Sequence, residues 1–504
     1  MKSQLTRVKF QVDGLEQDAF QILRAIRSWS NSLTPINRLP PELLALLPDF
    51  WDPPDRYHII ALTHVCQSWR ELFISRSVLW TNIYCVDLDK TRTYLERSKS
   101  SPINLSLSGS HDLSPSDPFL QIAPHVIGRL KSLSVKADSD TLPNITARLS
   151  LPAPLLEYLS IDGDRLLAPH LCPVLAPTLF DEDLSPVRKL RLTSVCTELP
   201  WRNMVNLTSF TLAYTPAGGI SVRHLLDFFE SAPRLRKVQL EAATLSPDAQ
   251  TGRLVSPACL KWMDVFGSVL SSLLLNHLLI PVGAELVMQA EFLGPPIEDR
   301  LPKYLENLRN LSGFTEIHSC MDRWCPSVRF GGPNGQVTMF PTSNHSLDTL
   351  RWMLGSLALF DTSKVERVEI NPGSQFICDP QAGDLIYQTL LAMKRLRTLM
   401  LSGCLFPRMF TGALRPSTSS GELACPELEE IVIGFHYDSE NFDIEDFAGM
   451  AAARAARGAK LKSVRIITHD EAVKAGALEL EEHVLCVRCG PDVGGAEGRK
   501  GRSW

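Results

Sequence analysis

Residues 396–401 read Leu-Arg-Thr-Leu-Met-Leu, and this spacing of three apolar residues recurs along the chain. The unit is apolar, two residues, apolar, one residue, apolar, and the alternation at its end is typical of a β-strand with one buried face. Its nine copies have the anchors Leu130/Leu133/Val135, Leu156/Leu159/Ile161, Val187/Leu190/Leu192, Leu207/Phe210/Leu212, Leu235/Val238/Leu240, Val365/Val368/Ile370, Leu396/Leu399/Leu401, Leu428/Ile431/Ile433 and Leu461/Val464/Ile466. Within each run of copies, first anchors lie 20 to 33 residues apart, which is typical of a solenoid of repeats.

Helical patterns precede several of these units. Residues 225–229 come before Leu235, and residues 385–393 come before Leu396. The segment 444–457 is entered by Asp443, a good N-cap, and left by Gly458, a good C-terminal stop. Helix and strand in alternation predict an α/β fold in which parallel strands are wound right-handed with the helices outside. The expected architecture is an irregular leucine-rich-repeat solenoid over residues 88–489.

Residues 270–345 depart from the repeat. Residues 327–340 predict a β-hairpin around Asn334-Gly335, since Asn-Gly between strand-like runs is a strong turn signal. We therefore expect an antiparallel insertion near 270–345. The glycine-rich, charged tail at 490–504 is expected to be disordered.

The first 87 residues lack the repeat and divide into two parts. Residues 1–35 have apolar positions at helical spacing and predict a short amphipathic helix, which docks on the next segment and is ended by Thr34-Pro35. Residues 36–87 predict a short all-helical module, whose first helix starts at the Leu39-Pro40-Pro41-Glu42 corner. So small a module buries little area, and it should depend on neighbours or partners for stability.

Composition restricts the classes of function. The 504 residues are 44% hydrophobic and 21% charged, with a formal charge of −5, so no general affinity for nucleic acid is expected. No apolar run is long enough to span a membrane, and the start of the chain does not resemble a signal peptide. The 12 scattered cysteines are typical of a reduced compartment. We expect a cytoplasmic or nuclear protein without a membrane partner.

No catalytic motif is present in the sequence, and we expect neither an enzyme nor a cofactor. Gly331 to Gly335 is glycine-dense but lies between strand-like runs, which favours a turn over a phosphate cradle. Cys486-x-x-Cys489 has the spacing of half a zinc site, with His483 nearby, but no second pair follows. His318, Cys320 and Cys325 form an equally weak metal candidate. Thiols without a metal-binding role are the expectation in both places.

The outward side chains of the predicted strands form one continuous face. They are polar and mixed in sign, as a surface that recognises a protein would be, although any solvated face has this character too. The candidate substrate-binding residues are Tyr158, Arg191, Gln239, Glu241, Arg367, Glu369 and Arg465.

Within residues 36–83 the chain resembles the F-box family. The matching stretches are LPPELL at 39–44, LTHVCQSWREL at 62–72 and LW at 79–80. A proline at position 48 departs from the usual end of the first helix. The remaining chain is similar to the repeat region of fungal F-box proteins. The resemblance implies a substrate-recognition adaptor of a cullin-type ubiquitin ligase, in which the module binds a Skp-type adaptor and the repeats bind a substrate protein. Carried over from the family, the residues that form or support the adaptor-binding surface are Leu39, Pro40, Leu43, Leu62, Val65 and Trp69.

Two other interpretations remain open. The chain could be a repeat scaffold with no role in ubiquitin ligation, its helical module serving as a structural cap. The ligase and scaffold interpretations differ in whether the Leu39-Pro40 surface is exposed or covered by the N-terminal helix. An enzyme site within residues 270–345 is the third interpretation, and it requires convergent polar residues in a pocket there.

Overall fold

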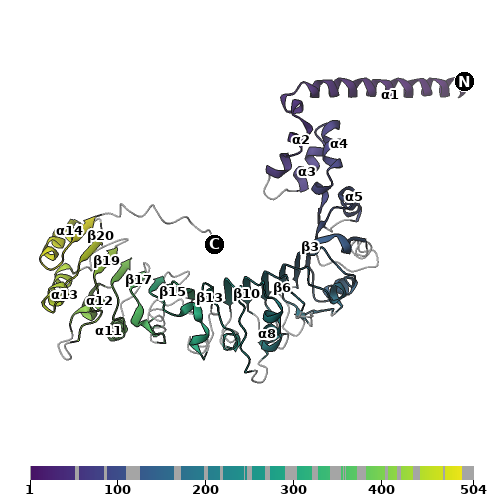
Figure 1. The fold of residues 1–504 in the computed structure, drawn as a ribbon. Coiled ribbons are helices and arrows are strands. Elements are labelled where there is room, and N and C mark those ends of the chain that lie inside the picture. The colour runs from purple at the N-terminus through teal and green to yellow at the C-terminus, as the bar shows by residue number, and fades with distance from the viewer. Residues whose placement is uncertain are drawn as a thin grey trace. The chain divides into compact units, whose positions relative to one another are not determined.

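The chain is seen in a computed structural model (Figure 1). It describes residues 2–50, 56–84, 88–108, 125–163, 172–176, 178–197, 203–215, 220–242, 245–246, 252–266, 273–289, 303–320, 327–340, 354–355, 357, 359–371, 382–402, 407–416, 422–434, 443–468 and 471–490. The chain forms two compact units. The first holds residues 1–164 and 173–187, and the second holds residues 165–172 and 188–504. The tail from residue 491 onward lies outside the described residues.

Helices dominate the start of the first unit. In chain order they are α1 (Lys2–Ser32), the 3-10 turn η1 (Pro35–Arg38), α2 (Pro41–Leu44), η2 (Leu47–Phe50), α3 (Arg56–Thr63), α4 (Gln67–Ser75) and η3 (Ser77–Trp80). The three short α-helices predicted for residues 36–83 are confirmed. Pro40 and Pro41 begin α2 because a proline in the first turn costs no helical hydrogen bond. Pro48 lies buried in η2, so the first helix of the module has a single turn.

The N-terminal helix differs from its prediction. It is a continuous helix of 31 residues, not a short one. Its apolar side chains, from Val8 to Trp29, are exposed, so the expected docking onto the helical module is wrong.

Aromatic side chains fill the small core of the helical module. The buried residues are Leu44, Ile59, Leu62, Trp69, Phe73, Leu79 and Trp80. Trp69 and Phe73 meet edge to face with ring centroids 5.7 Å apart. Trp80 packs against Tyr94 at 5.0 Å and lies under the guanidinium of Arg97 at 4.3 Å, both from α5 (Leu88–Ser98). Aromatic burial therefore stabilises a module that has few residues to bury.

Parallel strands follow within the same unit. They are β1 (Asn82–Tyr84), β2 (Ile103–Ser108), β3 (Leu130–Lys136) and β4 (Tyr158–Asp162), each paired in parallel with the next. Helix α7 (Leu142–Arg148) lies between β3 and β4 in the chain. The sheet thus starts at Asn82, five residues before the end of the predicted helical module.

The second unit carries a large, mostly parallel sheet. Its strands are β6 (Lys189–Thr193), β8 (Ser209–Ala213), β10 (Lys237–Glu241), β12 (Trp262–Phe266), β13 (Glu285–Gln289), β14 (Glu316–Cys320), β15 (Ser327–Gly332), β16 (Gly335–Phe340), β17 (Arg367–Asn371), β18 (Thr398–Ser402), β19 (Glu430–Gly434), β20 (Ser463–Ile467) and β21 (Val487–Gly490). Their spatial order is β6-β8-β10-β12-β13-β16-β15-β14-β17-β18-β19-β20-β21. Among these ladders only those of β15 are antiparallel.

The predicted hairpin is confirmed, and it lies within the sheet. β15 and β16 join through the Asn334-Gly335 turn, and Gly335 has φ 126°, a conformation that favours glycine. β16 pairs in parallel with β13, while β14 pairs in parallel with β17. β15 therefore lies between two parallel blocks and continues the sheet across the predicted insertion. A Cβ at Gly332 would lie 2.9 Å from Cα of Phe314, so the hairpin needs glycine there.

Helices line one side of the second unit's strands (Figure 1). They are α8 (Val222–Ser231), α11 (Ala382–Ala392), α12 (Pro407–Leu414) and α13 (Ile444–Ala456), with the shorter α14 (Glu471–Gly476) near the end. Phe210 of β8 meets Phe228 of α8 with ring centroids 4.4 Å apart, so the core lies between sheet and helices. The predicted caps of α13 are confirmed: Asp443 accepts from the backbone N–H of Asp446, and Gly458 has φ 80°.

All nine repeat units coincide with strands, and their anchors point into the core. Each of the 27 anchor side chains is buried. The predicted inward side is therefore correct at every copy, and in seven of the nine strands the residue between the last two anchors is partly or fully exposed.

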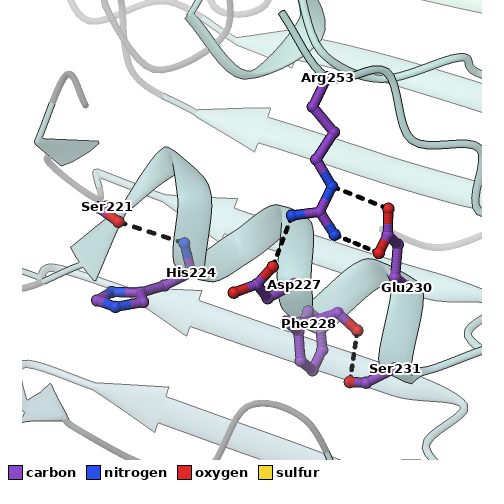
Figure 2. A network of polar contacts seen from close by, with 7 residues as sticks. All are labelled: Ser221, His224, Asp227, Phe228, Glu230, Ser231 and Arg253. Carbon is purple, nitrogen blue, oxygen red and sulfur yellow. Dashed lines mark hydrogen bonds and ion pairs between the residues drawn. The ribbon is translucent and has the colours of Figure 1, made fainter. Parts of the chain in front are cut away.

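A polar cluster ties α8 to the segment before β12 (Figure 2). Arg253 donates to Asp227 at 2.6 Å and to Glu230 at 3.0 Å, through Nη1 and Nε respectively. The oxygen of Ser221 accepts from the N–H of His224 at the start of the same helix. These contacts are partly solvated, so they orient the helix more than they stabilise it.

Across the described part of the chain, no helix is both long enough and apolar enough to cross a membrane.

Candidate protein-binding surfaces

The first candidate surface is on the helical module. Leu39, Pro40, Leu43 and Val65 are exposed, and we call them the corner patch. Leu39 is 42% exposed, Leu43 51% and Val65 53%, which is a large exposure for apolar side chains in a module of this size. Leu39 and Pro40 lead into α2, Leu43 lies on α2, and Val65 lies between α3 and α4.

The other two predicted adaptor-binding residues are buried. Leu62 is on α3, and Trp69 is on α4 within the core. The indole N–H of Trp69 donates to the side-chain oxygen of Asn37 at 2.6 Å, and Asn37 lies in η1 just before Leu39. Trp69 thus positions the corner patch without being exposed in it.

Sequence reasoning missed three residues of the module that bear on a candidate surface. Leu46 and Ile60 are exposed apolar side chains of the same module. Leu46 stands three residues after Leu43, a spacing that could have indicated a shared face. Asn37 gave no local signal, because its partner Trp69 is 32 residues away.

The second candidate surface is the side of the second unit's sheet opposite the helices, which we call the outward face. The strand registers align one outward residue from each of twelve strands into a central row. In spatial order it reads Arg191, Thr211, Gln239, Asp264, Val287, Thr338, Arg329, His318, Glu369, Met400, Val432 and Arg465.

Most of the predicted substrate-binding residues share this face. Arg191, Gln239, Glu369 and Arg465 are in the central row itself. Glu241 lies two residues after Gln239 on β10, and Arg367 two residues before Glu369 on β17. Tyr158, on β4, belongs to the first unit.

The face is too long for these residues to form one small site. At about 4.8 Å per strand, Arg191 and Arg465 are separated by roughly 50 Å along the sheet. The structure brings together smaller groups instead. Arg465 lies 3.9 Å from Glu430 of β19, and Glu241 accepts from the hydroxyl of Tyr214. Such a distribution suits recognition of a partner protein over a broad area.

Aromatic residues concentrate near the middle of the face, where sequence reasoning named none. Trp262, Phe266 and Phe340 all point outward and are partly buried. The ammonium of Lys237 lies 4.4 Å from the ring centroid of Trp262. Aromatic side chains beside charges are common at protein interfaces.

Asp264 is the least exposed charged group in this area, at 8%. The amide nitrogen of Gln289 lies 3.2 Å from both of its carboxylate oxygens. The pKa of Asp264 is raised to about 6, chiefly by burial and to a lesser extent by the charge of Glu241, against the hydrogen bond from Gln289 and the charge of Lys237, which lower it. This carboxyl therefore changes protonation in the physiological range of pH.

His318 is held between two carboxylates on the same face. Its Nδ1 lies 3.1 Å from Glu369 and its Nε2 lies 3.4 Å from Glu316. These contacts, with Glu369 the stronger, raise the pKa of His318 against the opposing effect of burial. The cluster joins β14 to β17, next to the inserted strand.

Of the two metal candidates, the one at His318, Cys320 and Cys325 lies partly outside the described residues. Over the described ranges, no three His, Cys, Asp or Glu side chains are grouped so as to hold a metal ion. Cys325 lies outside the described residues, and Cys489 is in β21.

Compared with known proteins, the chain matches no family model and no curated sequence.

Proposed function

We propose that the chain is the substrate-recognition subunit of a cullin-type ubiquitin ligase. In this proposal the helical module binds a Skp-type adaptor and, through it, a cullin. The strand-and-helix array acts as an irregular leucine-rich-repeat solenoid whose outward face binds a substrate protein. The chain itself performs no catalytic step, and it acts in the cytoplasm or the nucleus.

The observation that carries the proposal is the exposure of the corner patch. A module whose helices run from Pro35 to Trp80, with Leu39, Leu43 and Val65 on its surface, resembles half of a helix-on-helix interface. The hydrogen bond from Trp69 to Asn37 fixes the turn that precedes Leu39, so the corner patch is preorganised for a partner.

The same observation favours the proposal over a scaffold without a ligase role. A structural cap would have its apolar corner covered by the N-terminal helix, but α1 leaves Leu39 and Leu43 exposed.

The outward face supports a protein as the substrate class. Its central row mixes cations, carboxylates and apolar groups, among them Arg329, Glu369 and the partly buried Met400. A nucleic acid would require a surface dominated by cations. A face of this length also exceeds what a small molecule would cover.

The test is a pull-down of the full chain with a recombinant Skp-type adaptor. We expect the wild type to retain the adaptor and Leu39→Ala/Pro40→Ala to lose it, with circular dichroism unchanged because the sheet cores do not involve this corner. Lys131→Ala, an exposed change on β3, is the matched control and should bind normally. No binding by the intact chain, or full binding by the double variant, would favour the scaffold.

A further inference from the structure

Helix α1 carries a heptad repeat that the helical module leaves uncovered. Apolar residues recur at alternating steps of three and four: Leu5, Val8, Val12, Leu15, Ala19, Ile22, Ile26, Trp29 and Leu33. All but Leu33 lie within the 31 residues of α1, so the helix spans about four heptads. Sustained over that length, this spacing is the signature of a coiled coil.

These positions form an exposed stripe. From Val8 to Trp29, the large side chains at the first and fourth heptad positions are between 54% and 69% exposed. A helix of 31 residues is about 46 Å long at 1.5 Å per residue. Most helical stability in proteins comes from packing an apolar face, so a solvated stripe of this length requires a partner.

We propose that α1 pairs with α1 of a second copy of this chain in a parallel, two-stranded coiled coil. None of the stripe positions is charged, so like residues can meet across a two-fold axis. The first positions hold Leu5, Val12, Ala19, Ile26 and Leu33, and the fourth positions hold Val8, Leu15, Ile22 and Trp29. Val12, Ile26 and Leu15 follow the pattern of β-branched first and leucine fourth positions that favours two parallel strands, whereas Val8 and Ile22 do not, so the flanking charges decide the arrangement.

The charges flanking the stripe select the parallel orientation. In a parallel pair, Gln11 lies opposite Glu16 of the other chain, and Asp18 lies opposite Leu23, so no like charges meet. An antiparallel pair with full overlap would align Glu16 with Glu16 and Asp18 with Asp18. Like charges facing each other cost energy and select against that arrangement.

A dimer formed this way would carry two corner patches and two outward faces. Both helical modules follow the carboxyl ends of the paired helices, which a parallel coil places at the same end. A substrate with two binding sites could then be held by both copies, with an apparent affinity above that of either alone. The inference does not depend on adaptor binding and is tested without the adaptor.

The experiment is sedimentation equilibrium of the full chain. We expect twice the 56.1 kDa of one chain. Leu15→Glu/Ile22→Glu places four carboxylates in the interface and should halve the mass, with some loss of helical signal as α1 frays. Gln17→Glu/Gln21→Glu adds the same charge at exposed positions off the stripe and should stay dimeric. A monomeric wild type at tens of micromolar, or a stripe variant that remains dimeric, overturns the proposal.

Orientation is tested by cross-linking Ile26→Cys under mild oxidation. A parallel pair joins position 26 of one chain to position 26 of the other, as peptide mass spectrometry would detect. In the antiparallel pair position 26 faces position 8, so a mixture of Ile26→Cys and Val8→Cys chains would link these unlike positions. That result overturns the parallel arrangement.

Discussion

The indole nitrogen of Trp69 lies 2.6 Å from the side-chain oxygen of Asn37, and this hydrogen bond joins α4 to the turn that precedes α2. Asn37 also donates from its amide nitrogen to the carbonyl of Asn31 at 2.7 Å and to the hydroxyl of Thr34 at 2.8 Å. One side chain therefore links the end of α1, the turn η1 and the core of the helical module. The corner patch starts two residues later, at Leu39.

Asn37→Ala should destabilise the helical module and weaken adaptor binding. The indole N–H of Trp69 is buried, and leaving it without an acceptor costs about 1–3 kcal/mol. Asn37→Asp keeps the acceptor oxygen while removing the two donated bonds, so it should retain most of the binding. Adaptor affinity measured by calorimetry for the two variants distinguishes these roles. Equal affinity for Asn37→Ala and the wild type would contradict the positioning role of Trp69.

Replacing repeat anchors should cost far more than replacing outward residues. Leu399→Ala and Leu190→Ala each truncate a buried side chain and should destabilise by about 2–5 kcal/mol. Thr211→Ala, on the outward side of β8, should change stability by less than about 0.5 kcal/mol. Thermal melting of the three variants measures the difference. Ser160, an outward residue of β4, is buried and is not a suitable control.

The repeat strands could be predicted because their signal is local. Each anchor set, such as Leu399 and Leu401, needs only the two-residue alternation of a strand to be assigned a buried side. The hairpin at Asn334-Gly335 was equally local. Exposure of the corner patch was indicated by the excess of apolar residues in so small a module.

Contacts between distant segments could not be predicted in this way. The order of the inserted strands depends on β16 pairing with β13 and β14 with β17, and no local pattern encodes that exchange. The hydrogen bond between Asn37 and Trp69 likewise joins residues that are 32 positions apart in the sequence, and no local pattern predicts it. Burial of Leu62 depends on how α3 and α4 pack together, which the spacing of their residues leaves open.

Arg454 should be essential for the stability of the second unit's carboxyl-terminal part. This residue of α13 is fully buried, and its guanidinium donates to the carbonyls of Leu414 at 3.2 Å, Ala424 at 2.8 Å and Cys425 at 2.7 Å. Arg454→Met would fill the space but leave three carbonyls unpaired, so we expect a loss of about 3 kcal/mol or more in unfolding free energy.

Two further variants define that prediction. Arg454→Lys keeps the charge but lacks the planar guanidinium that reaches several carbonyls at once. Its unfolding free energy should lie between those of wild type and Arg454→Met. Arg457→Met, one turn away on an exposed position, should cost clearly less than Arg454→Met, because it leaves no buried carbonyl unpaired. Urea unfolding with hydrogen exchange of residues 407–468 measures the loss locally. If Arg454→Met were as stable as wild type, the three carbonyls would have other partners and Arg454 would not be essential.

Asp264 should make stability fall as the pH rises from about 4 to about 6. Its folded pKa, about 6, lies above the ordinary value of 3.8, so the folded state holds a proton that the unfolded state releases in this window. Above the window the carboxylate is ionised in a buried position. Asp264→Asn removes the titrating group and still accepts from Gln289. The melting temperature of Asp264→Asn minus that of wild type should rise between about pH 4 and about pH 6 and then level off. A difference that is the same at every pH would contradict the raised pKa of Asp264.

Variants of the six predicted adaptor-binding residues should fall into two classes, according to whether the residue is exposed or buried. Leu43→Asp and Val65→Asp introduce charge on exposed positions, so they should abolish adaptor binding while leaving the melting temperature close to that of wild type. Leu62→Ala and Trp69→Ala truncate buried side chains and should destabilise the module by about 2–5 kcal/mol. Their binding should be lost only as the module unfolds and should recover on cooling. Surface plasmon resonance at two temperatures, with circular dichroism on the same samples, distinguishes the classes. A partner helix could not pack on the corner patch once it carries a buried charge. If Leu43→Asp and Val65→Asp kept their affinity for the adaptor, the interface would therefore lie elsewhere on the module.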